Sequence, residues 1–191
     1  IELIRRAKEK KIKVTAETCP HYFTLTEEAA KEFNPNTKVS PPLRTATDVE
    51  AIKQALKEGI IDIIATDHAP HQFLEKEVPF EQAPSGIIGL ESALPISLKL
   101  VEEGVLTWPQ LITKMSYAPA KVFNLPGGSL KPGNLADITI IDPNFSYKID
   151  VNQFYSKGRN CPFHGWEVKG KAIMTIIGGN IVYRISEKQQ K

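Results

Sequence analysis

The stretch IIDIIATDH, residues 60–68, decides the fold class of this protein. Its first part is largely apolar and β-branched, and it ends in Asp67 and His68. A strand of this composition is typical of a parallel sheet, in which helices cover both faces. The carboxyl ends of such strands border the crevice where α/β proteins carry their active sites. We therefore expect Asp67, His68 and the nearby His71 to lie at a functional site.

Helix and strand patterns alternate on both sides of this stretch. Apolar spacing and capping residues predict helices over residues 1–10, 25–33, 45–59 and 89–104. β-branched residues predict another strand over residues 11–19. This alternation is typical of α/β proteins with parallel strands, so we assign residues 1–125 to a catalytic domain of that class.

The pattern changes in residues 126–191. Short β-branched or alternating runs follow one another, and turns are predicted at Pro143-Asn144 and at Gly178-Gly179-Asn180. These features predict a small antiparallel β unit attached to the catalytic domain.

The composition excludes two classes of partner. A net charge of +2 indicates no nucleic-acid surface. No apolar run approaches the roughly 20 residues that span a bilayer. Cys19 and Cys161 are isolated, which is typical of free thiols in a reducing compartment. We expect a cytoplasmic protein with a small-molecule substrate and neither nucleic-acid nor membrane partners.

Asp67 is the strongest candidate for catalysis. A carboxylate at a strand end can ligate a divalent metal ion and can also accept a proton. An aspartate here can equally form a turn or cap a helix, and D-H-x-P-H is no established metal signature. The loops 38–44 and 83–91 favour a site, because both carry Pro or Gly with polar atoms and are expected to open on the same face.

Several motifs in a fixed order carry a resemblance that covers nearly the whole chain. They are ETCPHYFTLTEE (17–28), KVSPPLR (38–44), IDIIATDHAPH (61–71), EKEVPFEQAPSGIIGLE (75–91) and GNLADITIIDPN (133–144). Together they resemble the C-terminal half of class I dihydroorotases, which belong to the amidohydrolase superfamily. The resemblance implies an α/β fold: about the last two strand–helix units of a distorted TIM barrel in residues 1–125, and part of a small β-sandwich in residues 126–191.

The resemblance also implies roles for individual residues. Asp67 matches the aspartate that binds metal and shuttles the proton of the hydrolytic water. His71 matches the histidine that binds the substrate carboxylate, and Ser85 and Gly86 match a pair whose backbone contacts the substrate ring. Ser40 stands where many dihydroorotases have an Asn that contacts substrate, and a serine there is familiar from hydantoinases and dihydropyrimidinases.

The implied reaction is the zinc-dependent interconversion of N-carbamoyl-L-aspartate and L-dihydroorotate in de novo pyrimidine biosynthesis. Two related activities stay open, because Ser40 favours a hydantoinase or dihydropyrimidinase, and allantoinases are similar. Hydantoinase-like members usually carry Asn at the position of Ile88, and allantoinases usually lack a His at His71, so dihydroorotase fits better. A non-catalytic assembly partner is a further alternative, against which the presence of Asp67 argues.

The family's other metal ligands have no match in this chain. They are an HxH pair, a bridging carboxylated Lys or an Asp, and two more His, all expected upstream of Ile1. His21 belongs to a later loop than these ligands, and Cys19 is expected to be a packed thiol. We therefore expect one or two zinc ions that Asp67 holds together with upstream residues, and an isolated chain without activity. The resemblance also implies a homo-oligomer, or a complex with aspartate transcarbamoylase, because dihydroorotases often form such assemblies.

Overall fold

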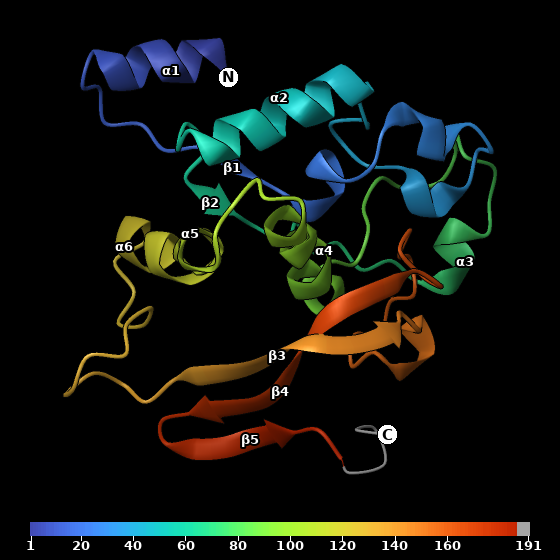
Figure 1. The fold of residues 1–191 in the computed structure, drawn as a ribbon. Coiled ribbons are helices and arrows are strands. Elements are labelled where there is room, and N and C mark those ends of the chain that lie inside the picture. Colours follow the sequence, from blue (N-terminus) through green and yellow to red (C-terminus); the bar gives the residue numbers. More distant parts are fainter. Residues whose placement is uncertain (187–191) are drawn as a thin grey trace.

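The computed structural model of the protein describes residues 1–186. Helices and short strands occupy its first part, and an antiparallel sheet lies against them (Figure 1). The helices are α1 (Glu2–Glu9), α2 (Ala46–Lys57), α3 (Phe73–Lys76), α4 (Leu90–Glu102), α5 (Trp108–Ile112) and α6 (Ala118–Val122). The strands are β1 (Glu17–Thr18), β2 (Ile63–Ile64), β3 (Ile138–Lys148), β4 (Glu167–Ile177) and β5 (Asn180–Arg184).

β1 and β2 form the predicted parallel pair, with Glu17 opposite Ile63 and Thr18 opposite Ile64. Farther along the chain, His68 forms a parallel bridge with Ile87. The strands are much shorter than the runs 11–19 and 60–68 predicted, because ladder hydrogen bonds need a neighbouring strand along their full length. The parallel direction brings the carboxyl ends of β1 and β2 to one edge.

The two long helices follow the sequence prediction closely. Thr45 and Asp48 form a capping box at the start of α2, and Gly59, with φ of +75°, follows its end. Gly104, with φ of +70°, likewise follows α4. The helix predicted over residues 25–33 is wrong: only a short 3-10 helix, Glu27–Ala30, forms there.

The failed helix has local causes. The Thr26 side chain makes no capping hydrogen bond, so the helix start lacks its expected stabilisation. Phe33 adopts φ of +55°, which takes the chain out of the helical region. Two further 3-10 helices flank this segment, Pro20–Phe23 and Pro35–Thr37, and the first of them positions a site residue.

One hydrophobic core connects the helical part to the sheet. Phe23, Leu56, Ile96, Leu100 and Phe163 are each 1% exposed or less and belong to the same cluster. α4 lies at the centre of this arrangement, between α2 and β4 (Figure 1). Ile64 at the end of β2 belongs to the same cluster, so this core helps to fix that strand end.

α4 and β4 approach each other closely at one glycine. A Cβ at Gly170 would lie 2.0 Å from Leu98 Cδ1, and Gly170 has φ of +88°. Only glycine combines that conformation with that approach without strain.

β3, β4 and β5 form an antiparallel sheet, as predicted for the second part of the chain. Gly178 and Gly179 make the turn between β4 and β5. The predicted turn at Pro143-Asn144 is wrong, because β3 runs through it with an irregular register between Asp142 and Ser146. Up to residue 186 the unit is one sheet; the second layer of the expected sandwich stays a prediction, and residues 187–191 lie outside the described part.

None of the helices in residues 1–186 combines the length and the apolar character needed to cross a bilayer. α1 buries none of its residues in this part of the chain and is attached by ion pairs. Arg5 pairs with Glu58 at 2.6 Å, and Lys8 pairs with Asp62 at 2.7 Å.

Candidate active site

Three metal-type donors meet at the carboxyl ends of the parallel strands. Cys19 directly follows β1, His21 lies in the 3-10 helix Pro20–Phe23, and Asp67 follows β2. One donor atom from each residue lies within 4.8 Å of the other two. Cys19 and His21 are buried and Asp67 is exposed, so the cluster opens outward on the Asp67 side.

Asp67 stands in an unusual backbone conformation. Its φ is +48°, in the left-handed region that non-glycine residues seldom adopt, although Asp is among those that tolerate it best. Such conformations cluster at functional sites, where the surrounding structure holds them. Here the strand β2 and the bridge of His68 with Ile87 fix the chain on either side of Asp67.

Burial determines the charge state of the other two donors. Burial raises the pKa of the Cys19 thiol to about 12, and the Asp67 and Glu17 carboxylates add to the rise. Burial lowers the pKa of His21 to about 4, and the Asp67 charge opposes this only in part. At neutral pH the cluster therefore holds a thiol, a neutral imidazole and the Asp67 carboxyl group.

His21 Nε2 is a buried polar atom without a hydrogen-bond partner in residues 1–186. Such atoms are rare in folded proteins, since leaving one unpaired costs about 1–3 kcal/mol. The sulfur, nitrogen and oxygen donors fit zinc, which binds Cys, His and Asp. The cluster thus fits the metal implied by the sequence, and it includes two residues to which the sequence assigned no metal role.

His71, Ser85 and Gly86 form a second group in neighbouring loops. His71 Nε2 lies 3.0 Å from the Ser85 carbonyl oxygen. A Cβ at Gly86 would lie 2.7 Å from Ala69 Cβ and 2.9 Å from His71 Nε2, and Gly86 has φ of +132°. Only glycine fits there without strain. Three of the predicted substrate-binding residues, His71, Ser85 and Gly86, therefore lie in direct contact.

Asn160 joins these loops and was missed by the sequence argument. It is 3% exposed, and its Nδ2 donates to the carbonyl oxygens of Ala69 at 2.9 Å and Gly86 at 3.0 Å. Its Oδ1 accepts from the His71 backbone N–H at 3.2 Å. One buried amide thereby holds the His71 loop and the Gly86 loop at a fixed separation.

Ser40 lies in a loop attached to the same region. The Gly86 N–H donates to the Lys38 carbonyl oxygen at 2.9 Å. The Tyr22 hydroxyl donates to the Pro41 carbonyl oxygen at 2.8 Å, which ties this loop to the 3-10 helix of His21. Ser40 is exposed and has no hydrogen bond to the other predicted site residues in the described part of the chain.

His68 has a structural role. Its Nδ1 accepts hydrogen bonds from the backbone N–H groups of Gly89 at 3.1 Å and Leu90 at 3.4 Å. These groups are unpaired donors at the start of α4, so His68 acts as a helix cap. The two histidines therefore have different roles. His68 stabilises the start of α4, and His71 contacts the loop of Ser85 and Gly86.

Comparison with known proteins decides the family. The profile described as the amidohydrolase family matches residues 2–182. The chain belongs to the amidohydrolase family. It is 54% identical over 184 residues to a dihydroorotase of Geobacter metallireducens, which covers 96% of this chain and 43% of that protein. It is 57% identical over 187 residues to a dihydroorotase of Endomicrobium trichonymphae, which covers 97% of this chain and 44% of that protein.

The chain is also similar to solved structures of other enzymes. The L-hydantoinase (dihydropyrimidinase) from Arthrobacter aurescens matches with a TM-score of 0.91 at 33% identity, over 97% of this chain and 43% of that one. The resemblance to dihydroorotases and the partial α/β barrel are thus confirmed. This amidohydrolase chain spans less than half the length of the relatives it matches.

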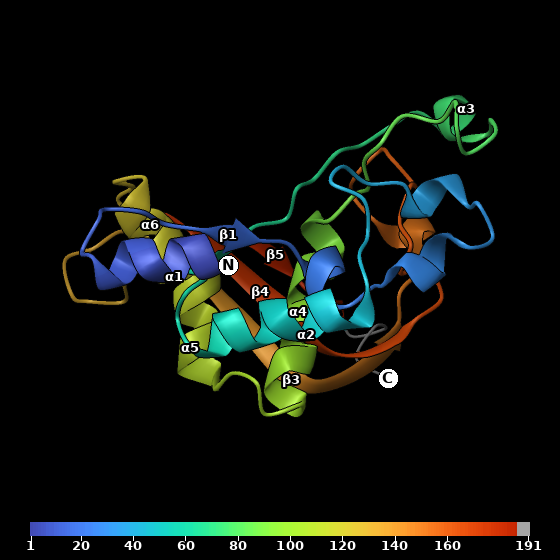
Figure 2. The ribbon, with the colours of Figure 1, turned by 90° about the horizontal axis from the view of Figure 1, so that it is seen from above.

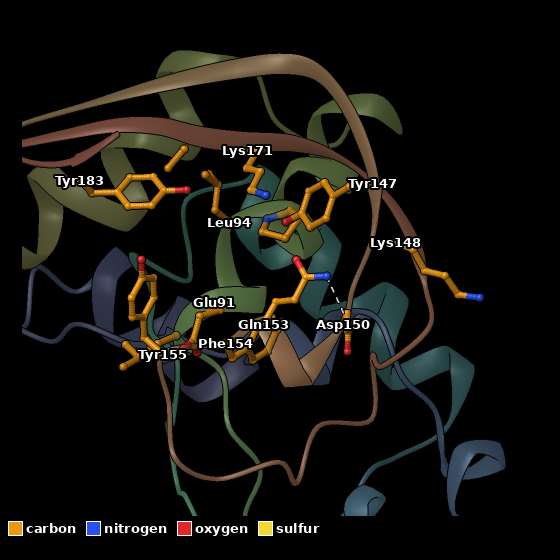
Figure 3. Close-up of a pocket in the computed structure, with 13 residues that line it drawn as sticks. Glu91, Leu94, Tyr147, Lys148, Asp150, Gln153, Phe154, Tyr155, Lys171 and Tyr183 are labelled. Carbon is orange, nitrogen blue, oxygen red and sulfur yellow. Dashed lines mark hydrogen bonds between the residues drawn. The ribbon is translucent and has the colours of Figure 1, made fainter. Parts of the chain in front are cut away.

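The amidohydrolase chain also contains a cavity of about 350 Å³ away from Asp67. Figure 3 shows the rings of Tyr147, Tyr155 and Tyr183 around it, with Lys171 at its border. The cavity lies beside α4 and the sheet, and it shares no lining residue with the strand-end cluster. It is therefore separate from the candidate active site.

The loop that carries His71 and α3 extends away from the rest of the amidohydrolase chain (Figure 2). Lys76, at the end of α3, anchors this loop. It is 7% exposed and donates to the carbonyl oxygens of Pro35 at 3.0 Å and Pro84 at 2.7 Å. Burial lowers its pKa from 10.5 to about 8, and the charge of Lys38 contributes. Burying the charged form is therefore costly.

Because the pKa of Lys76 is lowered, we expect its contribution to the free energy of unfolding to depend on pH. The folded pKa lies below the unfolded one, so the contribution of Lys76 to stability is full above pH 10.5 and is lost as the pH falls through about 8. We expect the free energy of unfolding of the wild type, minus that of Lys76→Met, to rise between those values. Urea unfolding of both proteins across this range measures it, and a flat or falling difference contradicts it.

Proposed function

We propose that this chain carries part of the active site of a metal-dependent cyclic amidohydrolase whose substrate is L-dihydroorotate. The reaction would be the reversible interconversion of that ring with N-carbamoyl-L-aspartate in pyrimidine biosynthesis. The observation that carries the proposal is Asp67, which lies at the carboxyl end of a parallel strand beside two further metal-type donors. Identities of 50–57% to dihydroorotases support this substrate over other cyclic amides.

Zinc is the proposed metal, with one or two ions. Asp67 would ligate it through oxygen, together with donors in the part of the relatives' length that this chain does not cover. When bound, the ion would supply a Lewis acid for the amide carbonyl and lower the pKa of water. The donors present in the chain fit zinc, since the sulfur of Cys19 and a ring nitrogen of His21 lie beside the Asp67 carboxyl group.

Asp67 would act as the general base and then as the general acid. It would take a proton from the water that adds to the ring carbonyl carbon, and it would deliver this proton to the ring nitrogen as the C–N bond breaks. An exposed carboxyl group at the mouth of the cluster is accessible to such a substrate. The same residue serves both directions, as a reversible reaction requires.

His71, Ser85, Gly86 and Ser40 would bind the substrate. His71 would hold the substrate carboxylate, and the backbone at Ser85 and Gly86 would contact the ring amide. The close contact between His71 and Gly86 supports a shared binding surface, because their loops are fixed to each other. Ser40 would contribute from the adjacent loop.

A second candidate function is hydrolysis of hydantoins or dihydropyrimidines. The serine at position 40 and the structural match to the Arthrobacter hydantoinase favour it. Its sequence identity of 33% is well below that of the dihydroorotases, so we place it second. An allantoinase-like activity and a non-catalytic assembly role are further alternatives that the same assay separates.

The proposed function also concerns the two domains of this chain and the oligomer of the complete enzyme. Residues 1–125 would belong to the catalytic barrel and residues 126–191 to the β-sandwich. Residues 1–191 by themselves would be inactive, since the family's metal centre draws most of its ligands from elsewhere. A homo-oligomer, with or without aspartate transcarbamoylase, is the proposed form of the complete enzyme.

His71→Ala is expected to raise the KM for dihydroorotate by about tenfold or more, with a smaller effect on kcat. The reason is that His71 would bind the substrate carboxylate, and a charge-assisted hydrogen bond is worth roughly 1.5–3 kcal/mol. Steady-state kinetics measure it, with His164→Ala as control, because His164 lies in the second part of the chain, where its Nδ1 accepts from the Val151 N–H. An unchanged KM contradicts the role of His71.

The proposed function is tested in a chimera in which this chain replaces the matching segment of the Geobacter metallireducens dihydroorotase, hereafter the chimera. Dihydroorotate, hydantoin, dihydrouracil and allantoin are supplied side by side. We expect turnover of dihydroorotate to exceed that of the others. Preference for hydantoin or dihydrouracil would support the second candidate, and a folded chimera that turns over none of the four would contradict an enzymatic role.

A further inference from the structure

We propose that Cys19, His21 and Asp67 form a metal site within residues 1–191 that binds a zinc-like divalent ion without any donor from outside the chain. The proposal shares Asp67 with the proposed function. It goes further, because it adds a thiolate and an imidazole that the sequence argument set aside. It also makes a claim about the chain by itself, which a binding measurement can test without any catalysis.

The first support is the local architecture. The parallel pairing of β1 with β2 places Cys19 and Asp67 at the same strand edge. The 3-10 helix Pro20–Phe23 then turns the chain, so that His21 lies close to the carboxyl ends of the two strands. The Leu25 N–H donates to the His21 carbonyl oxygen at 2.9 Å, which fixes this turn.

The second support is distance. The three donor atoms lie within 4.8 Å of one another. Around one tetrahedral zinc, with metal–donor distances of about 2.0–2.3 Å, donors lie roughly 3.5 Å apart. Metal binding would draw the three donor atoms closer together by rotation of their side chains.

The third support is an unpaired ring nitrogen of His21, which is an observation separate from the donor types and their distances. His21 is 1% exposed, and its Nε2 has no hydrogen-bond partner in residues 1–186. A histidine that served only as a packed core residue would be expected to pair its ring nitrogens. An imidazole left unpaired in a buried place, with a thiol and a carboxyl group beside it, is a donor available for a metal ion.

The donor set predicts the class of ion. Sulfur and imidazole donors favour zinc and cobalt, whereas magnesium and calcium prefer oxygen ligands. Three protein ligands leave a fourth position open, as in catalytic rather than structural zinc sites. Binding would release the thiol proton of Cys19 to the buffer, because the ligand is the thiolate.

The test is a titration of the 191-residue chain with Co²⁺, which substitutes for zinc and absorbs light when a thiolate binds it. We expect one Co²⁺ per chain and a sulfur-to-cobalt charge-transfer band. Cys19→Ser should abolish the band, and His21→Gln should weaken binding by at least about tenfold. Cys161→Ser and His164→Gln are the matched controls, a second buried cysteine and a histidine of the sheet unit, and both should bind like the wild type.

A second measurement uses the unmutated chain and does not depend on how the variants fold. Iodoacetamide alkylation of each cysteine is followed by peptide mass spectrometry, with and without Zn²⁺. Zinc should slow alkylation of Cys19 by about tenfold or more and leave the rate of Cys161 unchanged. Equal rates with and without zinc, absence of the cobalt band, or a band that persists in Cys19→Ser would each overturn the proposal.

These results are separable from those on the proposed function. If Cys19→Ser loses the cobalt band in the chain while the chimera still hydrolyses dihydroorotate, both proposals stand. If the band is absent and hydrolysis persists, only the three-donor site fails. If the band is present and no cyclic amide is hydrolysed, only the proposed function fails.

Discussion

Asp67→Asn is expected to lower the kcat of the chimera for dihydroorotate by about a thousandfold or more. The amide has nearly the shape of the carboxylate, so the fold should persist, but it accepts no proton from water and is a poorer metal ligand. In the proposed mechanism, the proton transfer and the metal site would therefore both lose Asp67. Turnover and zinc content, measured on the same preparation, report the two effects together.

A matched carboxylate outside the site serves as control for Asp67→Asn. Asp142 lies in β3, where its Oδ1 accepts from the Asn144 N–H at 2.9 Å. Asp142→Asn removes one negative charge from the sheet unit and should leave turnover unchanged. Near-wild-type turnover in Asp67→Asn would show that the assigned role is wrong.

Gly86→Ala is expected to lower kcat/KM of the chimera by about a hundredfold, since an ångström of misplacement can cost that much. The added Cβ would overlap Ala69 and the His71 ring, at 2.7 and 2.9 Å. It would also force alanine into φ of +132°, where strain costs about 1–3 kcal/mol. Relief of both requires the His71 loop and the Gly86 loop to separate.

Gly104→Ala separates backbone strain from displacement of the site. Gly104 has φ of +70° at the end of α4, and a Cβ there meets nothing within 4 Å. This variant should lose about 1 kcal/mol of stability and keep its kcat/KM. If Gly86→Ala behaves like Gly104→Ala in the kinetic assay, the contact between Gly86 and His71 has no part in substrate binding.

Local signals explain what the sequence predicted well. Thr45 and Asp48 mark the start of α2 by their own hydrogen bonds, and Gly59 marks its end, so the helix can be found without knowledge of its neighbours. The β-branched run around Ile63 likewise indicates a buried parallel strand. Its length could not be predicted, because the paired length depends on a neighbouring strand elsewhere in the chain.

Some residues of the candidate site could likewise be predicted from the sequence, and others could not. Asp67 could be proposed from its place at the end of a β-branched run, and His71 from the resemblance. Asn160 could not, since it lies 89 residues from the His71 backbone that it binds. Cys19 was set aside as a packed thiol, and His21 as part of a later loop than the family's ligands. No periodic pattern predicts the short 3-10 helix Pro20–Phe23, which places His21 close to Cys19 and Asp67.

The central claim is that Asp67 is a metal ligand at the ends of the parallel strands. X-ray diffraction from crystals of the chimera, collected at the zinc absorption edge, tests it most directly. We predict an anomalous density peak at about 2.0–2.2 Å from an Asp67 carboxylate oxygen. Zinc bound to the chimera with Asp67 outside its coordination sphere would contradict the claim.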